Sequence, residues 1–433
     1  MLIYSQKDNQ VIPSDQNKIK DTCVVLPGRN KCMLYEPVIP GERSKVGIVL
    51  MHEADYGFFP MARGLAERGF VTLGGSAGQR TTLEKQMLAV RDAVLFLKAL
   101  PGIEHVVLMG HSGGATIMTA YQRAAENGPA SMKENMLYAC TLADDEILPK
   151  ADGIMLIDAN YGNGAMTLLS IDPAVTEEGN GMNLDPRFDI YAPDHGFREG
   201  HTAYTDEFRK MYFKAQAQRN NRIIDAAVQE LADIEKGAGK YRDDMPYPVT
   251  GAAQIAPCNK LIPQDTGLLA HSRHPHPLIH KDKTITNEII YCHRKPQERK
   301  TTSASYFTIR NLSLREYLSG AAIRANENYH VGEDGVYGID WEHTFNCGPG
   351  NIPYITCPSL FMGMSGGYEY LAAEYLYERS AADDKEIAFT EGATHNIYPI
   401  SEEFGDTESL TFDYQADWLC RHFIKESDMH SAG

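Results

Sequence analysis

A serine flanked by glycines is the first feature of this sequence that could do chemistry. Ser112 lies in the pentapeptide GHSGG, which fits the G-x-S-x-G pattern of a serine nucleophile on a sharp turn. The apolar run VVLMG precedes the serine and GATIMTAYQRAAE follows it, which predicts a buried strand and then a helix. Glycines suit such a turn, because its backbone is strained and neighbouring chain comes close. We therefore expect Ser112 to be a nucleophile.

A serine hydroxyl also needs a base, and position identifies the histidine that fits. The chain has 15 histidines, so the residue type alone means little. His395 lies in KEIAFTEGATHNIYP, directly after a predicted strand and a glycine. A histidine that directly follows the final predicted strand and a glycine is a far more specific match than the residue type alone. His395 is therefore the candidate base.

With these residues in place, the chain resembles the α/β-hydrolase superfamily. The stretches GHSGG, DPAVTEE and EGATH carry the resemblance, which covers the ordered elements of roughly residues 20–160 and 350–430. Within it the chain looks like bacterial and fungal members of undefined substrate. The resemblance implies an α/β fold, with a mostly parallel eight-stranded sheet, helices on both faces and a large, mainly helical cap.

The acid of the triad is where this sequence departs from the family. The family carries an aspartate on the turn after the strand at 359–364, and glycines stand there in this chain. Glu369 lies two or three residues further on and ranks first as the replacement. Glu374, in the next helix, ranks second, and Asp158, at the end of the preceding strand of the sheet, ranks third. Each would hold the histidine tautomer and stabilise the imidazolium.

Fixed N–H donors must also stabilise the tetrahedral intermediate. We expect one from Gly113, the residue after the nucleophile. The second should come from the loop HEADYGFF, at the backbone of Ala54, or of Glu53 if the register shifts. Glu53 and Asp55 put carboxylates beside a site meant for negative charge. They must point away, pair with cations or bind substrate. Tyr56 is expected to be a packed aromatic, with a hydroxyl donor as the alternative.

Strands and helices alternate up to residue 160 and again from residue 350, which predicts a mostly parallel sheet. We expect a hydrolase core of residues 1–160 and 350–433, interrupted by a cap of residues 161–349. A long helix is predicted from Thr205 to Lys236, ended by Gly237. Because sites in open α/β sheets lie at the carboxyl ends of the strands, the cap should shape the substrate pocket.

Composition limits the partners. A net charge of −17 argues against nucleic acid and anionic membranes. No secretory signal or membrane span is visible, so a cytoplasmic location is expected. The eight cysteines, Cys258 among them, lack zinc spacing, and we expect no metal and no cofactor. Cys23–Cys32 and Cys347–Cys357 are the pairs to check for a disulfide. A small-molecule substrate is expected, and association of identical chains is left open.

Two further stretches carry residues that could form a site. HSRHPHPLIHK places His271, His274, His276 and His280 close together, but no cysteine or carboxylate has matching spacing for a metal. We expect a polar cap loop there, with pocket lining and a metal site as alternatives. The basic run at residues 293–300 is expected to be solvated cap surface, with binding of an anionic substrate group as the alternative.

These residues together predict a serine hydrolase. Ser112 would attack a carbonyl, His395 would move the proton and water would release the acyl group. The expected substrate is a small to medium ester, lactone or thioester. A C–C bond hydrolase or an amidase on the same triad is the runner-up. A non-catalytic ligand-binding protein of hydrolase fold is the alternative from another class, favoured by the absent aspartate and the acidic HEAD loop.

Overall fold

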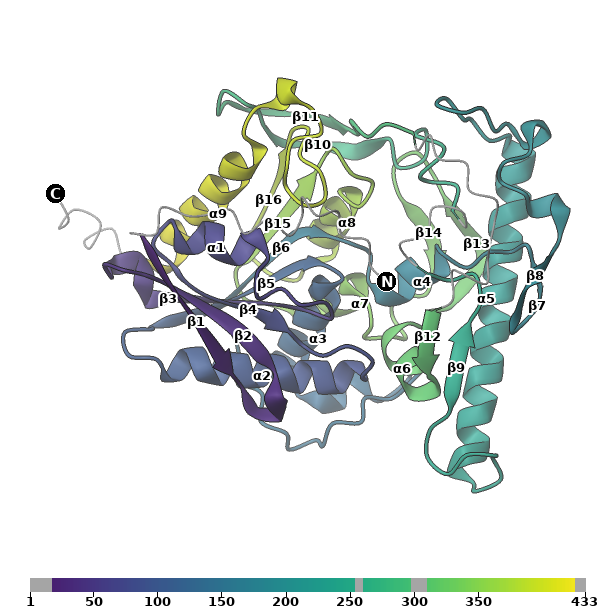
Figure 1. The fold of residues 1–433 in the computed structure, drawn as a ribbon, viewed down its shortest axis with the longest axis horizontal. Helices are drawn as coiled ribbons and strands as arrows, with labels where there is room; N and C mark the ends of the chain where they lie inside the picture. The colour runs from purple at the N-terminus through teal and green to yellow at the C-terminus, as the bar shows by residue number, and fades with distance from the viewer. Residues whose placement is uncertain (1–17, 254–259, 297–309, 425–433) are drawn as a thin grey trace.

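The computed structural model describes residues 18–253, 260–296 and 310–424, and it is built around one ten-stranded sheet (Figure 1). In spatial order the strands are β1 (Ile19–Val25), β2 (Lys31–Pro37), β4 (Val71–Ser76), β3 (Val46–His52), β5 (His105–Ser112), β6 (Gly153–Ala159), β15 (Ser359–Met364), β16 (Lys385–Thr390), β10 (His271–Ile279) and β11 (Ile285–Tyr291). The run from β4 to β10 is parallel, and antiparallel pairs close both ends.

The central strands are buried on both faces, as their continuous apolar sequences predict. Helices cover both sides of the sheet: α1 (Pro60–Ala66), α2 (Leu83–Ala99), α3 (Gly114–Asn127), α8 (Leu371–Arg379) and α9 (Thr407–Phe423). Residues of α2, α3 and α8 belong to one hydrophobic core, and residues of α1 and α9 belong to the other. The expected α/β sheet with helices on both faces is therefore confirmed.

The sheet has ten strands where eight were expected, because the insertion contributes two of them. Strand β10 pairs in parallel with β16, matching Leu278 to Phe389 and Ile279 to Thr390, and β11 then forms the edge. The expected strand count was therefore wrong. The sequence HSRHPHPLI does not read as a sheet strand, because histidines and prolines interrupt its apolar residues.

The rest of the insertion mixes helices with short strands, so the expectation of a mainly helical cap was also wrong. Its other elements are α4 (Asn163–Leu168), β7 (Val175–Glu177), β8 (Asn180–Leu184), α5 (Asp206–Glu235), β9 (Pro246–Val249), β12 (Arg310–Ser313), α6 (Leu314–Gly320), β13 (Ala325–Val331) and β14 (Val336–Ile339). Three two-stranded sheets join β7 to β8, β9 to β12 and β13 to β14. A short helix, α7 (Gly348–Asn351), leads back to β15.

The long helix α5 matches its prediction closely. Thr205 caps its first turn by accepting a hydrogen bond from the Phe208 N–H, and Lys236 is the C-cap. Gly237 follows with a positive φ of 72°, a conformation that glycine adopts without strain. The helix stands at the side of the molecule away from β1 and β2 (Figure 1).

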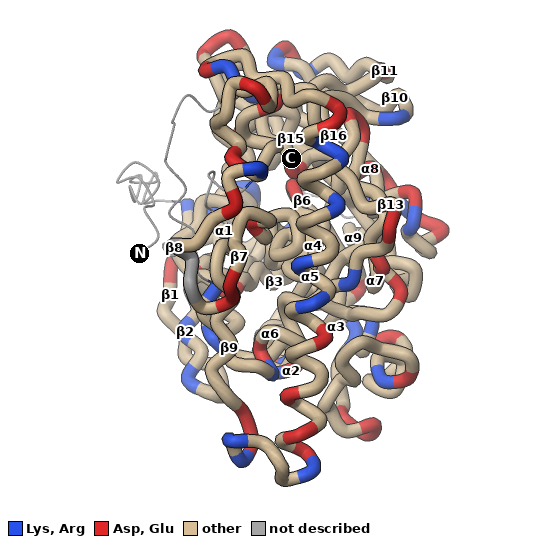
Figure 2. Tube along the Cα trace, turned by 90° about the vertical axis from the view of Figure 1, so that its right-hand side faces the viewer, with Lys and Arg blue, Asp and Glu red and all other residues tan. Residues whose placement is uncertain are grey.

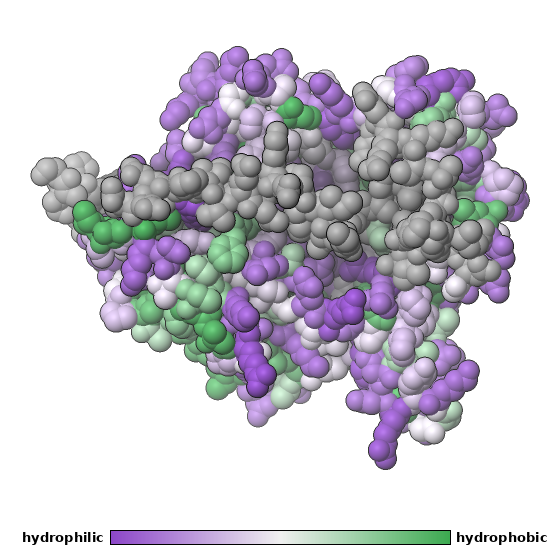
Figure 3. Space-filling model, viewed as in Figure 1, coloured by the Kyte–Doolittle hydropathy of each residue, from purple (hydrophilic) through white to green (hydrophobic). Residues whose placement is uncertain are grey.

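The surface carries both signs of charge. In Figure 2 acidic and basic residues are interspersed along the chain. Apolar residues gather over the part of Figure 3 where β1 and β2 lie in Figure 1. Val25, in β1, and Ile39, which follows β2, are exposed. Within the described part of the chain, no helix is long and apolar enough to cross a bilayer.

The cysteines that the structure describes are free thiols, so neither Cys23–Cys32 nor Cys347–Cys357 is a disulfide. Cys258 and residues 297–300 of the basic run lie outside the described residues.

Candidate active site

Ser112 lies on a sharp turn between β5 and α3. It is the last residue of the strand and has a positive φ of 54°, which is strained for a residue with a side chain. Two neighbouring glycines make the turn feasible. A Cβ on Gly110 would lie 2.6 Å from the Ala115 Cα, and one on Gly114 would lie 2.7 Å from the Met51 carbonyl oxygen. The strand-to-helix turn predicted from GHSGG is therefore present.

The structure pairs His395 with Asp158. The Nδ1 atom of His395 lies 2.6 Å from Oδ2 of Asp158. The other carboxylate oxygen accepts a hydrogen bond of 2.8 Å from the Met364 N–H, at the end of β15, so both oxygens are oriented. Asp158 is fully buried near the end of β6, and the next residue, Ala159, pairs with Ser112 on β5. Asp158 and Ser112 therefore lie at the ends of adjacent strands.

This pairing overturns the order in which the three carboxylates were ranked. The Glu369 Oε2 atom lies 3.9 Å from His395 Nδ1, beyond hydrogen-bond distance. The family aspartate was expected at Gly366 or Gly367. A Cβ on Gly366 would lie 2.6 Å from the Ala393 carbonyl oxygen and has no room, whereas one on Gly367 would make only ordinary contacts, the nearest at 3.7 Å from the Glu369 Oε2 atom. Asp158, ranked third, is the carboxylate that binds the histidine.

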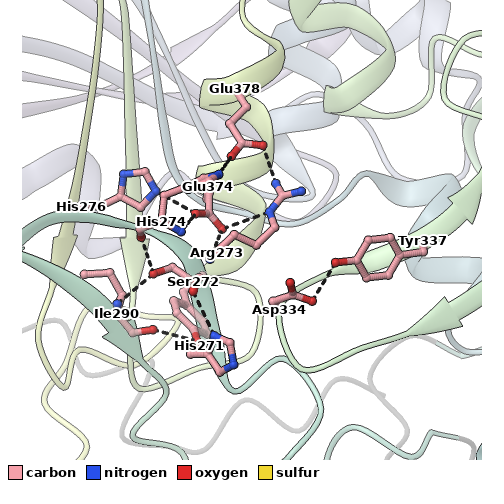
Figure 4. A network of polar contacts seen from close by, with 11 residues as sticks. His271, Ser272, Arg273, His274, His276, Ile290, Asp334, Tyr337, Glu374 and Glu378 are labelled. Carbon is pink, nitrogen blue, oxygen red and sulfur yellow. Dashed lines mark hydrogen bonds and ion pairs between the residues drawn. The ribbon is translucent and has the colours of Figure 1, made fainter.

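Glu374, ranked second, is turned away from His395 and holds the insertion against the core. It is buried on α8 and accepts hydrogen bonds from the backbone N–H of Arg273 at 3.0 Å and of His274 at 2.9 Å. Its Oε1 atom also lies 2.9 Å from Nε2 of His276 (Figure 4). The carboxylate therefore fixes strand β10 to α8.

His395 has an unusual proton affinity. Burial lowers the pKa of its imidazole, but the negative charges of Glu369 and Asp158 outweigh that effect and raise the pKa to about 9. Among the described residues, Ser112 Oγ and His395 form no hydrogen bond; contacts of this kind often close only when substrate binds.

His111 and Tyr56 join the serine turn to the His395 loop, a contact that the sequence pattern did not single out. The His111 Nε2–H donates to the His395 carbonyl oxygen at 2.7 Å, so its Nδ1 accepts from the Tyr56 hydroxyl at 2.8 Å. Burial holds the pKa of His111 well below its usual value, which keeps the ring neutral. His111 thereby ties the His395 loop to the serine turn. The sequence signal that could have identified His111 is its position next to Ser112 in GHSGG.

Of the two backbone N–H groups expected to be oxyanion donors, one is unpartnered among the described residues and the other is used elsewhere. Within the described structure the Gly113 N–H has no hydrogen-bond partner, as a donor awaiting substrate would. The Ala54 N–H is instead donated to the His52 Nδ1 atom at 2.9 Å, which contradicts its assignment as the second donor; the alternative, the Glu53 N–H, stays a prediction. The Asp55 carboxylate accepts from the Gly57 N–H at 2.8 Å and stays within its own loop.

The histidines of the insertion do not converge on one point. His276 binds Glu374 and His280 binds Glu391, on different elements. Across the described ranges, one set of three metal-type ligands comes together, and it is Asp158, Glu369 and His395. From the basic run, Arg294 is partly buried and donates to backbone carbonyls of the insertion, including Leu269, so it is not solvated surface.

A pocket between α5 and β13 lies apart from the Ser112 site. It has a volume of about 580 Å³ and is lined by Phe213 and Tyr329 among others. None of its lining residues belongs to the Ser112 site.

No protein-family model matches the chain, and no curated protein does. Solved structures similar to it include α/β-hydrolases, esterases and lipases. The α/β hydrolase GrgF from Penicillium sp. sh18 is 12% identical, with 93% of this chain and 98% of that chain covered and a TM-score of 0.42. An esterase, E25, is 10% identical, with 94% and 80% covered and a TM-score of 0.43. Est1E from Butyrivibrio proteoclasticus is 10% identical, with 92% and 99% covered and a TM-score of 0.40.

Proposed function

We propose that the protein is a serine hydrolase acting on a carboxylic ester, lactone or thioester of small to medium size. The observation that carries the proposal is the Asp158–His395 pair beside a serine on a strained strand-to-helix turn. An aspartate that fixes the tautomer of a histidine base next to a serine is the arrangement needed for acyl transfer.

The chemistry follows from the atoms. Asp158 binds Nδ1–H of His395, which leaves the Nε2 atom of the neutral ring as the base. Ser112 Oγ forms a bond to the substrate carbonyl carbon as its proton passes to Nε2. The imidazolium then protonates the leaving group, and the acyl group stays on Ser112. Water, deprotonated by His395, attacks this acyl-enzyme, and the acid product leaves with Ser112 restored.

The paired aspartate weakens the case for a non-catalytic relative. That alternative relied on the absence of a carboxylate on the turn after β15. The Asp158 carboxylate, near the end of β6, binds His395 instead. We further propose that residues 161–349 form the wall of the substrate pocket and determine specificity, with a small molecule as the only partner that catalysis requires.

A fluorophosphonate probe tests the proposal, because it reacts with an activated serine. We expect the wild-type protein to be labelled and Ser112→Ala not to be. Hydrolysis of p-nitrophenyl esters of graded acyl length, run beside lactones, then defines the substrate class. Absence of labelling in folded wild-type protein, shown by circular dichroism, would refute the proposal, and labelling that persists in Ser112→Ala would assign the reactivity to another residue.

A further inference from the structure

Three polar side chains converge on the space beside Gly113, the residue after the nucleophile. A Cβ on Gly113 would lie 2.8 Å from Asn163 Oδ1, 3.2 Å from His52 Nε2 and 3.8 Å from Asn160 Nδ2. His52 is the last residue of β3, Asn160 directly follows β6, and Asn163 is the first residue of α4. Glycine leaves this space open. Two of the three atoms, His52 Nε2 and Asn160 Nδ2, are nitrogens, whereas Asn163 Oδ1 is an acceptor.

The hydrogen bond to His52 fixes where its proton lies. The Ala54 N–H donates to Nδ1 of the ring at 2.9 Å, so in the neutral ring the hydrogen is on Nε2, the atom nearest Gly113. Burial lowers the pKa of His52 to about 4, so the ring is neutral near pH 7. Its plane stacks on Tyr56 at a centroid distance of 4.6 Å. The Nε2–H is thus a donor held in place before substrate arrives.

Asn160 gives independent evidence that a hydrogen-bond acceptor can bind beside Gly113. Its Oδ1 atom accepts from the Gly162 N–H at 2.9 Å, which orients the amide. The Nδ2 atom is buried and has no hydrogen-bond partner in the described structure. Buried donors are almost always paired, and exceptions of this kind mark strain, a catalytic role or an unseen partner. The partner here would be an oxygen brought close to Gly113.

We propose that His52 is a catalytic residue whose Nε2–H, together with the Gly113 N–H, binds the oxyanion of the tetrahedral intermediate. The inference rests on the proposed hydrolase function and names a side-chain donor where the Ala54 amide was expected. The Ala54 N–H acts on the ring instead, because its bond to Nδ1 selects the tautomer that donates. A neutral donor fixed in advance stabilises charge that develops during the reaction without first having to reorient.

Two substitutions at the same position separate this role from a merely structural one. His52→Asn keeps an acceptor near the place of Nδ1 but has no atom at Nε2. His52→Gln carries an amide N–H near the place of Nε2 but loses the acceptor for the Ala54 N–H. We expect kcat for a p-nitrophenyl ester to fall about 100- to 1000-fold in His52→Asn, with KM within a few-fold of wild type, and to fall far less in His52→Gln.

The outcomes are distinguishable. The reverse order, with His52→Asn active and His52→Gln impaired, would mean that His52 only holds the loop, and the inference would fall. Wild-type rates in both variants would overturn it as well. If His52→Asn does not fold, His52→Phe also removes the donor while keeping an aromatic ring against Tyr56, and it should show the same loss.

A second measurement tests the oxyanion directly. A trifluoromethyl ketone adds to Ser112 and places an oxyanion in the site, so its affinity should weaken in His52→Asn by about the factor lost in kcat/KM. Unchanged affinity would contradict the inference. Fluorophosphonate labelling of the wild-type protein is read first. If wild type is not labelled, the proposed function itself fails; if it is labelled and His52→Asn hydrolyses ester at the wild-type rate, only the role of His52 fails.

Discussion

Replacing Glu369 by glutamine should move the pH dependence of activity while leaving the triad intact. The Glu369 carboxylate lies 3.9 Å from His395 Nδ1, whereas Asp158, at 2.6 Å, makes the hydrogen bond. His395 must be neutral to accept the proton of Ser112. The negative charge of Glu369 favours the imidazolium instead. Its removal therefore lowers the pKa of His395, and the acidic limb of the kcat/KM profile shifts to lower pH.

The separation of the two groups sets the size of the shift. Two unit charges 3.9 Å apart interact by about 4 kcal/mol at an effective dielectric constant of about 20, and by about 1 kcal/mol in bulk water. The Glu369 side chain is 12% exposed and that of His395 is 29% exposed, so the environment lies between these limits. At about 1.4 kcal/mol per pKa unit, the limb should move down by about one to three units.

The lower pKa of His395 should raise kcat/KM at neutral pH. The pKa of His395 is about 9 in the intact site, so only about one molecule in a hundred has a neutral base at pH 7. A downward shift of about one unit makes that fraction roughly ten times larger, and kcat/KM at pH 7 should rise by about the same factor. Activity above the limb should change little, because the Asp158 pair remains.

The assay is kcat/KM for one p-nitrophenyl ester, measured from about pH 6 to about pH 10 with spontaneous hydrolysis subtracted. Glu378→Gln is the matched control, since Glu378 lies on α8, the helix that follows Glu369, and pairs with Arg273. Its profile should coincide with that of wild type. An unmoved or raised limb in Glu369→Gln would refute the electrostatic reasoning. A large loss at every pH would instead make Glu369 the triad acid.

Two substitutions test the other carboxylates. Asp158→Asn keeps the shape of the side chain but no longer holds His395 in its working tautomer, and we expect kcat to fall about 10⁴-fold with little change in melting temperature; a loss below ten-fold in steady-state assays would contradict the assignment. Glu374→Gln weakens the bonds to His276 and to the Arg273 N–H, so urea unfolding should show a stability loss of about 1–3 kcal/mol while kcat stays near wild type. Lost activity at unchanged stability would contradict that structural role.

The features predicted well from sequence are those with local causes. The turn at Ser112 was recognisable because a buried strand, two glycines and a helix follow one another within a short stretch. The ends of α5 were recognisable because Thr205 and Gly237 act on their own helix turns. The position of His395 shortly after β16 was recognisable because the strand KEIAFT and a glycine precede it. In each case the information lies within a few residues of the feature.

The features predicted poorly depend on contacts between distant segments. Strand β10 pairs with β16, and Glu374 on α8 binds its backbone and His276; nothing within HSRHPHPLI indicates either partner. The choice of acid failed for a similar reason. Chain spacing favoured Glu369, but the orientation of β6 beside β5 brings the Asp158 carboxylate to His395, and only the fold sets that distance.

The insertion contacts the turn that follows β15, next to Glu369. This turn packs closely, since a Cβ on Gly366 would lie 2.6 Å from the Ala393 carbonyl oxygen. The Ser365 carbonyl oxygen accepts from the His293 N–H at 2.7 Å, and the Cys292 thiol donates to the Gly367 carbonyl oxygen at 3.0 Å. Both donors directly follow β11. The insertion thus braces the turn next to Glu369, so shifts of the β10–β11 hairpin would reach His395 through the charge that sets its pKa.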